Sequence, residues 1–349
     1  MIKIQNVYYM LAYAFQTLHE DGYKKVATEQ FHNVAELCAA ILIKGVSIQI
    51  KRGLDRAYLS ETDTLSGIRG RINITDSIKI QSMLRKQIVC TYDEFSLNTY
   101  MNRIIKTTMV NLIHVNIDKT RKKDLKSLLV FFADVDELEI NSINWKQQYD
   151  RNNQTYRMLI SICYLVLKGL LQTTLDGRTK LMCFDEQRMS HLYEKFILEY
   201  YKIEFPTIKA EASQIKWMLD DEHGSMLPVM KSDITLSYGN QVLIIDAKYY
   251  AHTTQVHFDN HTLHSGNLYQ IFTYVKNKDA ELKDCPHEVS GMLLYAKTDE
   301  NIVPNNEYRM SGNKISVKSL DLSGNFENIE SQLCAIVKDH FGDIPKRKR

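Results

Sequence analysis

The sequence has few of the features that mark secreted, membrane-embedded or strongly charged proteins. Its 44 Lys and Arg residues nearly balance 42 Asp and Glu residues, so a formal net charge of +2 gives no global argument for a nucleic-acid partner. The six cysteines are scattered without a Cys-x-x-Cys pair, which is typical of reduced, buried thiols. The longest apolar run, 158–167, is too short to span a bilayer, and no signal peptide is recognisable. We therefore expect a soluble, cytoplasmic protein.

Internal repeats, low-complexity segments and a Gly-x4-Gly-Lys-Ser/Thr loop are also missing, which argues against a repeat architecture and against GTP binding by this chain. What is present suits two or three globular domains, because 349 residues, 44% hydrophobic and 25% charged, can bury several cores. We expect a multidomain protein of the α+β or α/β class.

The first 90 residues combine helical and strand patterns. Apolar residues recur at helical spacing over 7–18 and 29–43, and three later stretches alternate or are bounded by glycine as strands are: 46–50, 56–60 and 67–74. These patterns predict an N-terminal region, 1–90, with two helices and a small, strongly curved sheet or β-barrel-like unit.

Beyond about residue 91 the pattern becomes helical. Amphipathic helices are predicted at 98–113, 122–132 and 155–171, and the loop composition of 172–179 indicates a domain boundary. We therefore expect a helical connecting segment, 91–178, and a C-terminal domain, 179–349, in which helices flank a mixed sheet.

Positive side chains are concentrated in two places. They alternate with glycine and apolar residues near the predicted strands at Lys51, Arg52, Arg56, Arg69 and Arg71, and they cluster in the helical segment at Lys119, Arg121, Lys122, Lys123 and Lys126. Solvated surfaces explain both sets. Contact with nucleic acid is the alternative for both, and contact with an acidic protein is a further alternative for the first.

A hairpin is predicted where two β-forming runs, 231–238 and 241–250, flank the turn dipeptide Gly239-Asn240. A two-residue loop places Asp233 directly opposite Asp246, with Cβ atoms about 4.5–5.5 Å apart. Two carboxylates at that distance repel each other unless a cation or a shared proton lies between them.

Lys248 projects from the same face as Asp246, because alternate residues of a strand share a face. Two oxygen ligands and an ammonium suit Mg²⁺-dependent phosphodiester hydrolysis, with Mn²⁺ as the alternative cation. The metal polarises the phosphate and acidifies its water, while a lysine can orient that water or offset developing charge. A salt-bridged hairpin is the simpler explanation of these three residues taken alone.

The arrangement resembles the PD-(D/E)xK nuclease superfamily, in which an Asp on one strand and Asp/Glu-x-Lys on the next form the site. Asp233 and Asp246-Ala247-Lys248 match this pattern, although Pro228 precedes the first Asp by five positions rather than one. The resemblance implies that the backbone carbonyl of Ala247 is a further metal ligand. It also implies that a helix before the strands supplies another carboxylate.

Two glutamates compete for that upstream carboxylate. On the predicted helix, Glu194 lies beside Ile197 at the edge of the apolar face, whereas Glu199 lies on the other side, near Lys195. We favour Glu194 as a metal ligand or water-holding group. Surface salt bridges are the alternative for both residues.

Downstream, Gln270 and Tyr274 lie four residues apart on a predicted helix and so share a face. A Gln-x-x-x-Tyr pair after the Asp/Glu-x-Lys strand is the added signature of the RecB-like branch, and it implies that both side chains support the lysine or a phosphate. An ordinary amphipathic helix that packs Tyr274 is the alternative.

Four histidines precede that helix: His252, His257, His261 and His264. Their spacing matches no common zinc finger and no cysteine joins them, so a substrate-facing loop is favoured over a zinc site. His264 is expected to neighbour the active site.

Further motifs extend the resemblance to nearly the whole chain. Their order and spacing are similar to those of the McrC family: Asn6-Val-Tyr-Tyr-Met-Leu-Ala-Tyr-Ala, Gly67-Ile-Arg-Gly-Arg-Ile, Asn102-Arg103-Ile-Ile-Lys106, Leu192-Tyr-Glu-Lys-Phe, Ser232-Asp-Ile-Thr, Ile245-Asp-Ala-Lys-Tyr-Tyr and His264-Ser-Gly-Asn-Leu-Tyr-Gln270. McrC is the nuclease subunit of McrBC modification-dependent restriction systems. The resemblance therefore implies an endonuclease subunit that cleaves double-stranded DNA containing methylated cytosine.

The same resemblance implies a partner, a McrB-like AAA+ GTPase hexamer that binds the GTP, recognises methylated cytosine and is entered and stimulated by the N-terminal region. Candidates for contact with it are Arg69, Arg71, Asn102 and Arg103. Two other hypotheses stay open. One is a stand-alone RecB-like repair nuclease, and the other is a subunit that acts chiefly in assembly and GTPase activation.

Overall fold

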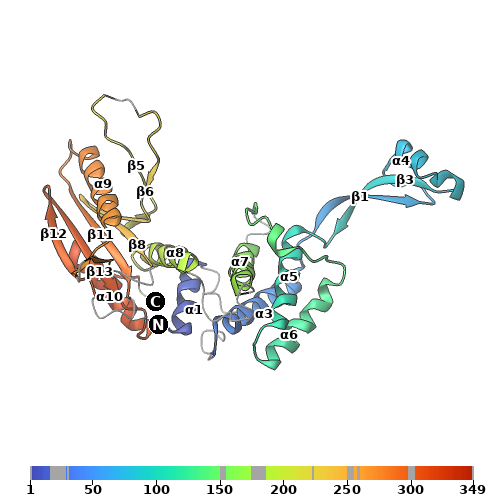
Figure 1. The fold of residues 1–349 in the computed structure, drawn as a ribbon, viewed down its shortest axis with the longest axis horizontal. Coiled ribbons are helices and arrows are strands. Elements are labelled where there is room, and N and C mark those ends of the chain that lie inside the picture. Colours follow the sequence, from blue (N-terminus) through green and yellow to red (C-terminus); the bar gives the residue numbers. More distant parts are fainter. Residues whose placement is uncertain are drawn as a thin grey trace. The chain divides into compact units, whose positions relative to one another are not determined.

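The computed structural model describes residues 2–15, 29, 31–149, 155–173, 186–221, 224–249, 255–257, 260–297 and 303–347 (Figure 1). Contacts divide the chain into two units, Met1–Phe31 with Phe184–Arg349, and His32–Cys183. These units do not coincide with the three expected segments, 1–90, 91–178 and 179–349, whose functional assignments stay predictions. Most of the boundary expected at 172–179 lies outside the described residues.

Among the described helices, none has the length and apolar character needed to cross a membrane.

The unit His32–Cys183 is built on helices that pack against one another. They are α3 (Val34–Arg52), α5 (Tyr100–His114), α6 (Lys119–Leu129) and α7 (Tyr156–Thr173), with the short 3-10 turns η4 (Val130–Phe132) and η5 (Ile140–Ser142). Asn33 and Thr99 begin α3 and α5 as N-caps, since each side chain accepts a hydrogen bond from a backbone N–H in the first turn. The helices expected at 98–113 and 155–171 are therefore confirmed as α5 and α7.

The strand expected at 46–50 is wrong, because these residues form the last turns of α3. The buried positions Leu42, Val46 and Gln49 continue the buried face of the helix at spacings of three and four residues. An alternation of apolar and polar residues over only five positions is too short to exclude a helix. Lys51 and Arg52 then lie in the last turn, where positive charge favours the helix.

A three-stranded antiparallel sheet completes this unit, in the order β1-β3-β2. Its strands are β1 (Ala57–Leu65), β2 (Arg71–Ile72) and β3 (Ile88–Ser96), with α4 (Ile74–Lys79) and η3 (Ser82–Arg85) between β2 and β3. The sheet is open, so the barrel-like closure expected here is wrong: three strands, one of them two residues long, cannot close on themselves. The expected change to helix near residue 91 is also wrong, since β3 runs to Ser96.

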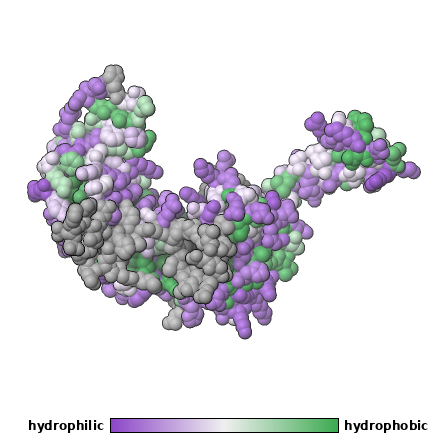
Figure 2. All heavy atoms as spheres, in the orientation of Figure 1, coloured by the Kyte–Doolittle hydropathy of each residue, from purple (hydrophilic) through white to green (hydrophobic). Residues whose placement is uncertain are grey.

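This sheet, with α4 and η3, exposes large apolar side chains: Tyr58, Ile68, Ile72, Ile74, Ile78, Ile80, Met83, Leu84 and Phe95. Figure 2 shows hydrophobic atoms among hydrophilic ones on this part of the unit. So many large apolar side chains exposed on one small sheet are typical of a contact site for another protein.

The other unit contains a six-stranded mixed sheet in the order β12-β13-β11-β8-β7-β4. The strands are β4 (Lys209–Glu211), β7 (Ile234–Tyr238), β8 (Gln241–Lys248), β11 (Glu288–Ala296), β12 (Asn306–Met310) and β13 (Asn313–Leu320). β8, β11 and β13 are parallel to one another, and each of the other three strands pairs antiparallel with its neighbours. The mixed sheet flanked by helices that was expected for the C-terminal part is confirmed.

Three helices pack on this sheet, α8 (Glu186–Glu204), α9 (Ser265–Glu281) and α10 (Phe326–Phe341), and α1 (Ile4–Ala14) packs on α8. Two small antiparallel pairs complete the unit, β5 (Gln214–Ile215) with β6 (Met230–Lys231), and β9 (Gln255–His257) with β10 (Asn260–Thr262). Although α1 opens the chain, it packs on α8, with Tyr13 donating a hydrogen bond to Glu204 at 2.7 Å and its ring 5.3 Å from that of Tyr200. α9 contributes Ile271 and Val275 to the core on β8 and β11.

Candidate metal centre

The hairpin of β7 and β8 has the predicted register, because Tyr238 pairs with Gln241 across the two-residue turn. The same register, continued past the first residue of β7, sets Asp233 opposite Asp246. The backbone N–H of Ala247 donates to Oδ2 of Asp233 at 2.9 Å. Turn geometry therefore brings the two carboxylates together at one end of the hairpin.

Asp246 is 1% exposed, and Asp233 is half-buried. Neither carboxylate oxygen of Asp246 accepts a hydrogen bond with good geometry from the described residues, although Oδ2 lies 2.9 Å from the Lys248 ammonium. A buried carboxylate without hydrogen-bond donors is costly unless a cation or a proton compensates it. Lys248 supplies one positive charge here, whereas two carboxylates meet, so the position suits a further cation.

Lys248 links the carboxylates to α9. Besides its contact with Asp246, its Nζ donates to Oε1 of Gln270 at 3.4 Å, and Nε2 of Gln270 donates to the Tyr274 hydroxyl at 3.0 Å. The structure thus joins four of the predicted residues in one line of contacts from β8 to α9. The sequence predicted these contacts from spacing, because Asp246 and Lys248 are two residues apart on a strand and Gln270 and Tyr274 are four apart on a helix.

The two carboxylates titrate as a pair. Burial, followed by the charges of Asp246 and Glu194, raises the pKa of Asp233 well above its usual range, against the opposing effects of Lys248 and the Ala247 N–H. Burial also raises the pKa of Asp246, and Lys248 opposes it. We expect the pair to retain a proton at neutral pH when no cation is bound, and a divalent cation to displace that proton.

Glu194 lies on α8 within electrostatic reach of both aspartates. Its Oε1 accepts from the Ser190 hydroxyl at 3.1 Å, and its Oε2 is 3.6 Å from Nδ1 of His191. Glu199 instead pairs with Lys202 at 2.8 Å. Of the two candidates, Glu194 is the one coupled to the aspartate pair, and its role as a ligand stays a prediction.

In the part of the chain that the structure describes, no group of three His, Cys, Asp or Glu side chains is arranged to hold a metal ion. The donors that the fold does bring together are the carboxylates of Asp233 and Asp246. A hard divalent cation fits such a set, because it prefers oxygen ligands and completes its shell with backbone carbonyls and water.

Among the candidates for partner contact, Asn102 is buried and hydrogen-bonded at both ends of its amide. Its Nδ2 donates to the carbonyls of Asp55 and Leu97 at 2.8 Å each, and its Oδ1 accepts from the Tyr156 hydroxyl at 3.0 Å. These bonds fasten the residues that flank β1 and β3 to α5 and α7. The side chain of Asn102 thus has a structural position that the sequence did not indicate.

The arginines differ from one another. The guanidinium of Arg69 lies 3.9 Å from the Tyr92 ring centre and 3.4 Å from Glu94, and Arg71 is exposed on β2. Arg103 is half-buried, and its Nε has no hydrogen-bond partner among the described residues. Contact of these arginines with a partner stays a prediction.

Of the four clustered histidines, the structure describes the side chain of His264 alone. His252 lies outside the described residues, and only the backbone is described for His257 in β9 and His261 in β10. His264 is the N-cap residue of α9. The substrate-facing loop expected there stays a prediction.

Two neighbours of the centre were missed from the sequence. Nδ2 of Asn267 donates to the hydroxyl of Tyr295 at 2.9 Å, and Tyr295 pairs with Lys248 in the β8–β11 ladder. A signal for Asn267 was present, since it lies three residues before Gln270 and so shares its helix face. Tyr295 had none, because its strand pairing with Lys248, 47 residues away in the sequence, is not a local pattern.

Fold and centre together define a mixed α/β protein whose sheet carries a buried carboxylate–lysine centre beneath a helix. The chain belongs to the family of McrBC 5-methylcytosine restriction system components, whose family model matches residues 3–296. The resemblance to McrC inferred from the sequence motifs is thereby confirmed.

Two known proteins illustrate the relationship. The chain is 27% identical over 348 residues to the type IV methyl-directed restriction enzyme EcoKMcrBC of Escherichia coli (strain K12), covering 98% of this chain and 99% of the relative. A solved structure, the refined half-complex from the tetradecameric assembly of Thermococcus gammatolerans McrB AAA+ hexamers with bound McrC, matches with a TM-score of 0.50 and 15% identity. That match covers 94% of this chain and 76% of the other, and at this identity it concerns the fold alone.

Proposed function

We propose that this chain is the endonuclease subunit of a GTP-dependent restriction complex of the cytoplasm, and that it hydrolyses double-stranded DNA containing methylated cytosine. The observation that carries the proposal is the convergence of Asp233, Asp246 and Lys248, in which two carboxylates, one of them fully buried, share a single ammonium. Family membership and the description of the Escherichia coli relative as a methyl-directed restriction enzyme support the choice of substrate.

In this proposal Asp233 and Asp246 hold a divalent cation, Mg²⁺ in the first place and Mn²⁺ as the alternative. The backbone carbonyl of Ala247 is a further ligand, and Glu194 binds the cation directly or through water. When bound, the cation supplies Lewis-acid polarisation of the phosphate and acidifies a nearby water. The raised pKa values of both aspartates support this assignment, since cation binding offsets the cost of ionising them.

Lys248 orients the attacking water or offsets the charge that develops on the phosphate. Its long side chain is flexible, so its position depends on what holds the ammonium. Asp246 and Gln270 hold it from two sides, and Tyr274 in turn fixes the amide of Gln270. Gln270 and Tyr274 thereby limit the conformations that Lys248 samples, which preorganises the centre.

We further propose that the unit His32–Cys183 assembles with a McrB-like AAA+ GTPase hexamer, which binds the GTP, and stimulates its GTP hydrolysis. The apolar side chains exposed on β1, β3, α4 and η3 support this second activity. So does the solved complex of a relative, described as McrB AAA+ hexamers with bound McrC. The candidates for polar contact are Arg69, Arg71 and Arg103. Asn102 instead contributes by holding the fold of this unit together.

A plasmid-cleavage assay tests the nuclease proposal. Methylated and unmethylated plasmid are incubated with the chain in Mg²⁺, with and without the partner GTPase and GTP. We expect cutting of methylated plasmid only, and only with partner and GTP. Asp246→Asn should lower the rate by roughly a thousandfold or more, because losing the bound cation forfeits several kcal/mol of transition-state stabilisation. Assembly and GTP turnover should not change.

Asp343→Asn is the matched control, since that side chain is 85% exposed and remote from the centre in sequence, and it should cut like wild type. Cutting by the chain alone would identify a stand-alone RecB-like nuclease instead. Strong GTPase stimulation without any cutting would identify an assembly subunit. Loss of assembly together with cleavage in Asp246→Asn would count against the catalytic role.

A further inference from the structure

The position of α9 on the sheet decides whether its side chains reach the centre. Near its middle, α9 lies so close to β11 that a Cβ on Gly291 would lie 2.7 Å from Val275 Cγ2 and 2.9 Å from Ile271 Cγ1. The bond from Lys248 to Gln270 is already long, at 3.4 Å. A displacement of α9 by a few tenths of an ångström away from the sheet would therefore break it.

One buried hydrogen bond ties the N-terminal half of α9 to β11 beside this contact. Asn267, 8% exposed in the first turn of α9, donates to the hydroxyl of Tyr295 at 2.9 Å. Tyr295 is fully buried and is the direct neighbour of Lys248 in the parallel β8–β11 ladder. Asn267, Gln270 and Tyr274 are three and four residues apart, so all three lie on one face of the helix.

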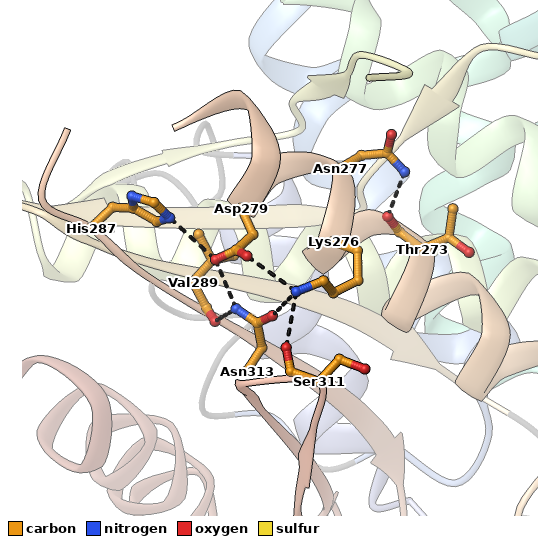
Figure 3. Close-up of polar contacts among 8 residues, drawn as sticks. All are labelled: Thr273, Lys276, Asn277, Asp279, His287, Val289, Ser311 and Asn313. Carbon is orange, nitrogen blue, oxygen red and sulfur yellow. Dashed lines mark hydrogen bonds and ion pairs between the residues drawn. The ribbon is translucent and has the colours of Figure 1, made fainter. Parts of the chain in front are cut away.

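The C-terminal half of α9 is fixed by a separate network, shown in Figure 3. Nζ of Lys276 donates to Asp279 at 3.1 Å, to the carbonyl of Ser311 at 3.0 Å and to Asn313 at 2.8 Å. Nδ2 of Asn313 donates to Asp279 at 2.9 Å and to the carbonyl of Val289 at 3.1 Å. Polar contacts therefore hold α9 near both of its ends, and this second set lies about one and a half turns or more beyond Gln270.

We propose that Asn267 and Tyr295 are positioning residues of the nuclease centre. Their hydrogen bond holds the N-terminal half of α9 at the distance from the sheet at which Gln270 reaches Lys248. Each residue therefore acts through Gln270 rather than on the DNA. Two apolar side chains would fill the same space without burying polar atoms, but they would lack the direction that a hydrogen bond imposes on the helix. The inference rests on the proposed function for its catalytic consequence.

Tyr295→Phe removes only the hydroxyl, and Asn267→Leu removes the donor at similar volume. In the assembled complex with partner, GTP and Mg²⁺, we expect kcat for cleavage of methylated DNA to fall roughly tenfold in each, as for other residues that orient a metal site, with KM unchanged. The double variant should be no slower than the slower single variant, because either single variant already removes the bond that the two residues share.

Asn313→Ala is the control, since it breaks the distal network without touching the proximal bond. It should lower the melting temperature yet keep kcat within about twofold of wild type. Hydrogen exchange adds a readout that needs no catalysis: Tyr295→Phe should accelerate exchange in the N-terminal half of α9, and Asn313→Ala in the C-terminal half.

Wild-type kcat in Tyr295→Phe, additive losses in the double variant, or an equal loss of kcat in Asn313→Ala would each overturn the inference. Unaltered exchange in the N-terminal half of α9 would overturn it as well. If wild type does not cut, or Asp246→Asn cuts normally, the proposed function is what fails. The exchange pattern then still decides whether the pair holds the helix.

Discussion

At the scale of single residues, two carboxylate–lysine pairs of the same unit show opposite pKa shifts. Asp246 lies 2.9 Å from Lys248, and Asp321 lies 2.7 Å from Lys297. Burial raises the pKa of Asp246 in spite of its lysine, whereas Lys297 and Ser323 lower the pKa of the more exposed Asp321 to about 2. Proximity of a lysine alone thus does not set the direction of a carboxylate's pKa shift, because burial can outweigh it.

Asp321 provides a test of this electrostatic argument. Because its folded pKa, about 2, lies below that of an unfolded chain, the carboxylate stabilises the fold above about pH 4 and loses that contribution as the pH falls toward 2. Asp321→Asn should therefore lower the free energy of unfolding at pH 7 by about 1 kcal/mol, since partial exposure screens the pair. The difference should shrink below pH 4.

Urea unfolding of wild type and Asp321→Asn between pH 7 and pH 3 measures this difference directly. Asp343→Asn, at a side chain 85% exposed, should show little difference at any pH. A deficit in Asp321→Asn that stays constant over the whole range would mean that the side chain stabilises the turn by hydrogen bonding alone.

At the scale of elements, the close approach of α9 to β11 at Gly291 predicts a strong effect of a single methyl group. Gly291→Ala places that methyl against Ile271 and Val275, both fully buried, so these side chains must shift, and we expect α9 to move outward with them. We expect a loss of about 1–3 kcal/mol in the free energy of unfolding. Cleavage should slow as well, because the shift draws Gln270 away from Lys248.

Gly266 lies on the same helix and serves as the control for that variant. No atom lies within 4 Å of the Cβ that Gly266→Ala would add. Alanine also has the better helix propensity, so stability should stay equal or rise by up to about 1 kcal/mol. Denaturant unfolding compares the two variants, and equal stabilities would show that α9 is not held at van der Waals distance from β11.

At the scale of the whole molecule, the division into two units means that the proposed partner contact and the proposed chemistry can be altered separately. Leu84 is 82% exposed in η3, among the apolar side chains of the three-stranded sheet. Leu84→Glu should weaken binding to the GTPase partner by about tenfold or more, as loss of an interface anchor does. Its circular dichroism should match wild type, because the side chain supports no core.

Biolayer interferometry with the partner, together with GTP turnover, measures this effect. Val130→Glu is the control, because Val130 is 72% exposed in the same unit but lies on η4, away from the sheet in sequence. Equal affinity for the partner in Leu84→Glu and wild type would place the contact elsewhere on the chain.

Local patterns in the sequence were sufficient for the hairpin and for the helix that follows it. A two-residue turn leaves one register, and the register decides which side chains face each other; Asp233, Asp246 and Lys248 therefore converge as expected. The spacing of Gln270 and Tyr274 likewise determined that they share a face of α9. The same reasoning failed at 46–50, where a short alternating stretch also fits the end of a helix.

Only the tertiary structure decided which of these groups are buried and what lies across from them. It placed α1 on α8, left the three-stranded sheet open, and brought Asn267 to Tyr295. It also removed Asp246 from solvent, which distinguishes the centre from a surface ion pair. The physical reason is that periodicity is set by neighbours along the chain, whereas burial depends on how segments distant in sequence pack together.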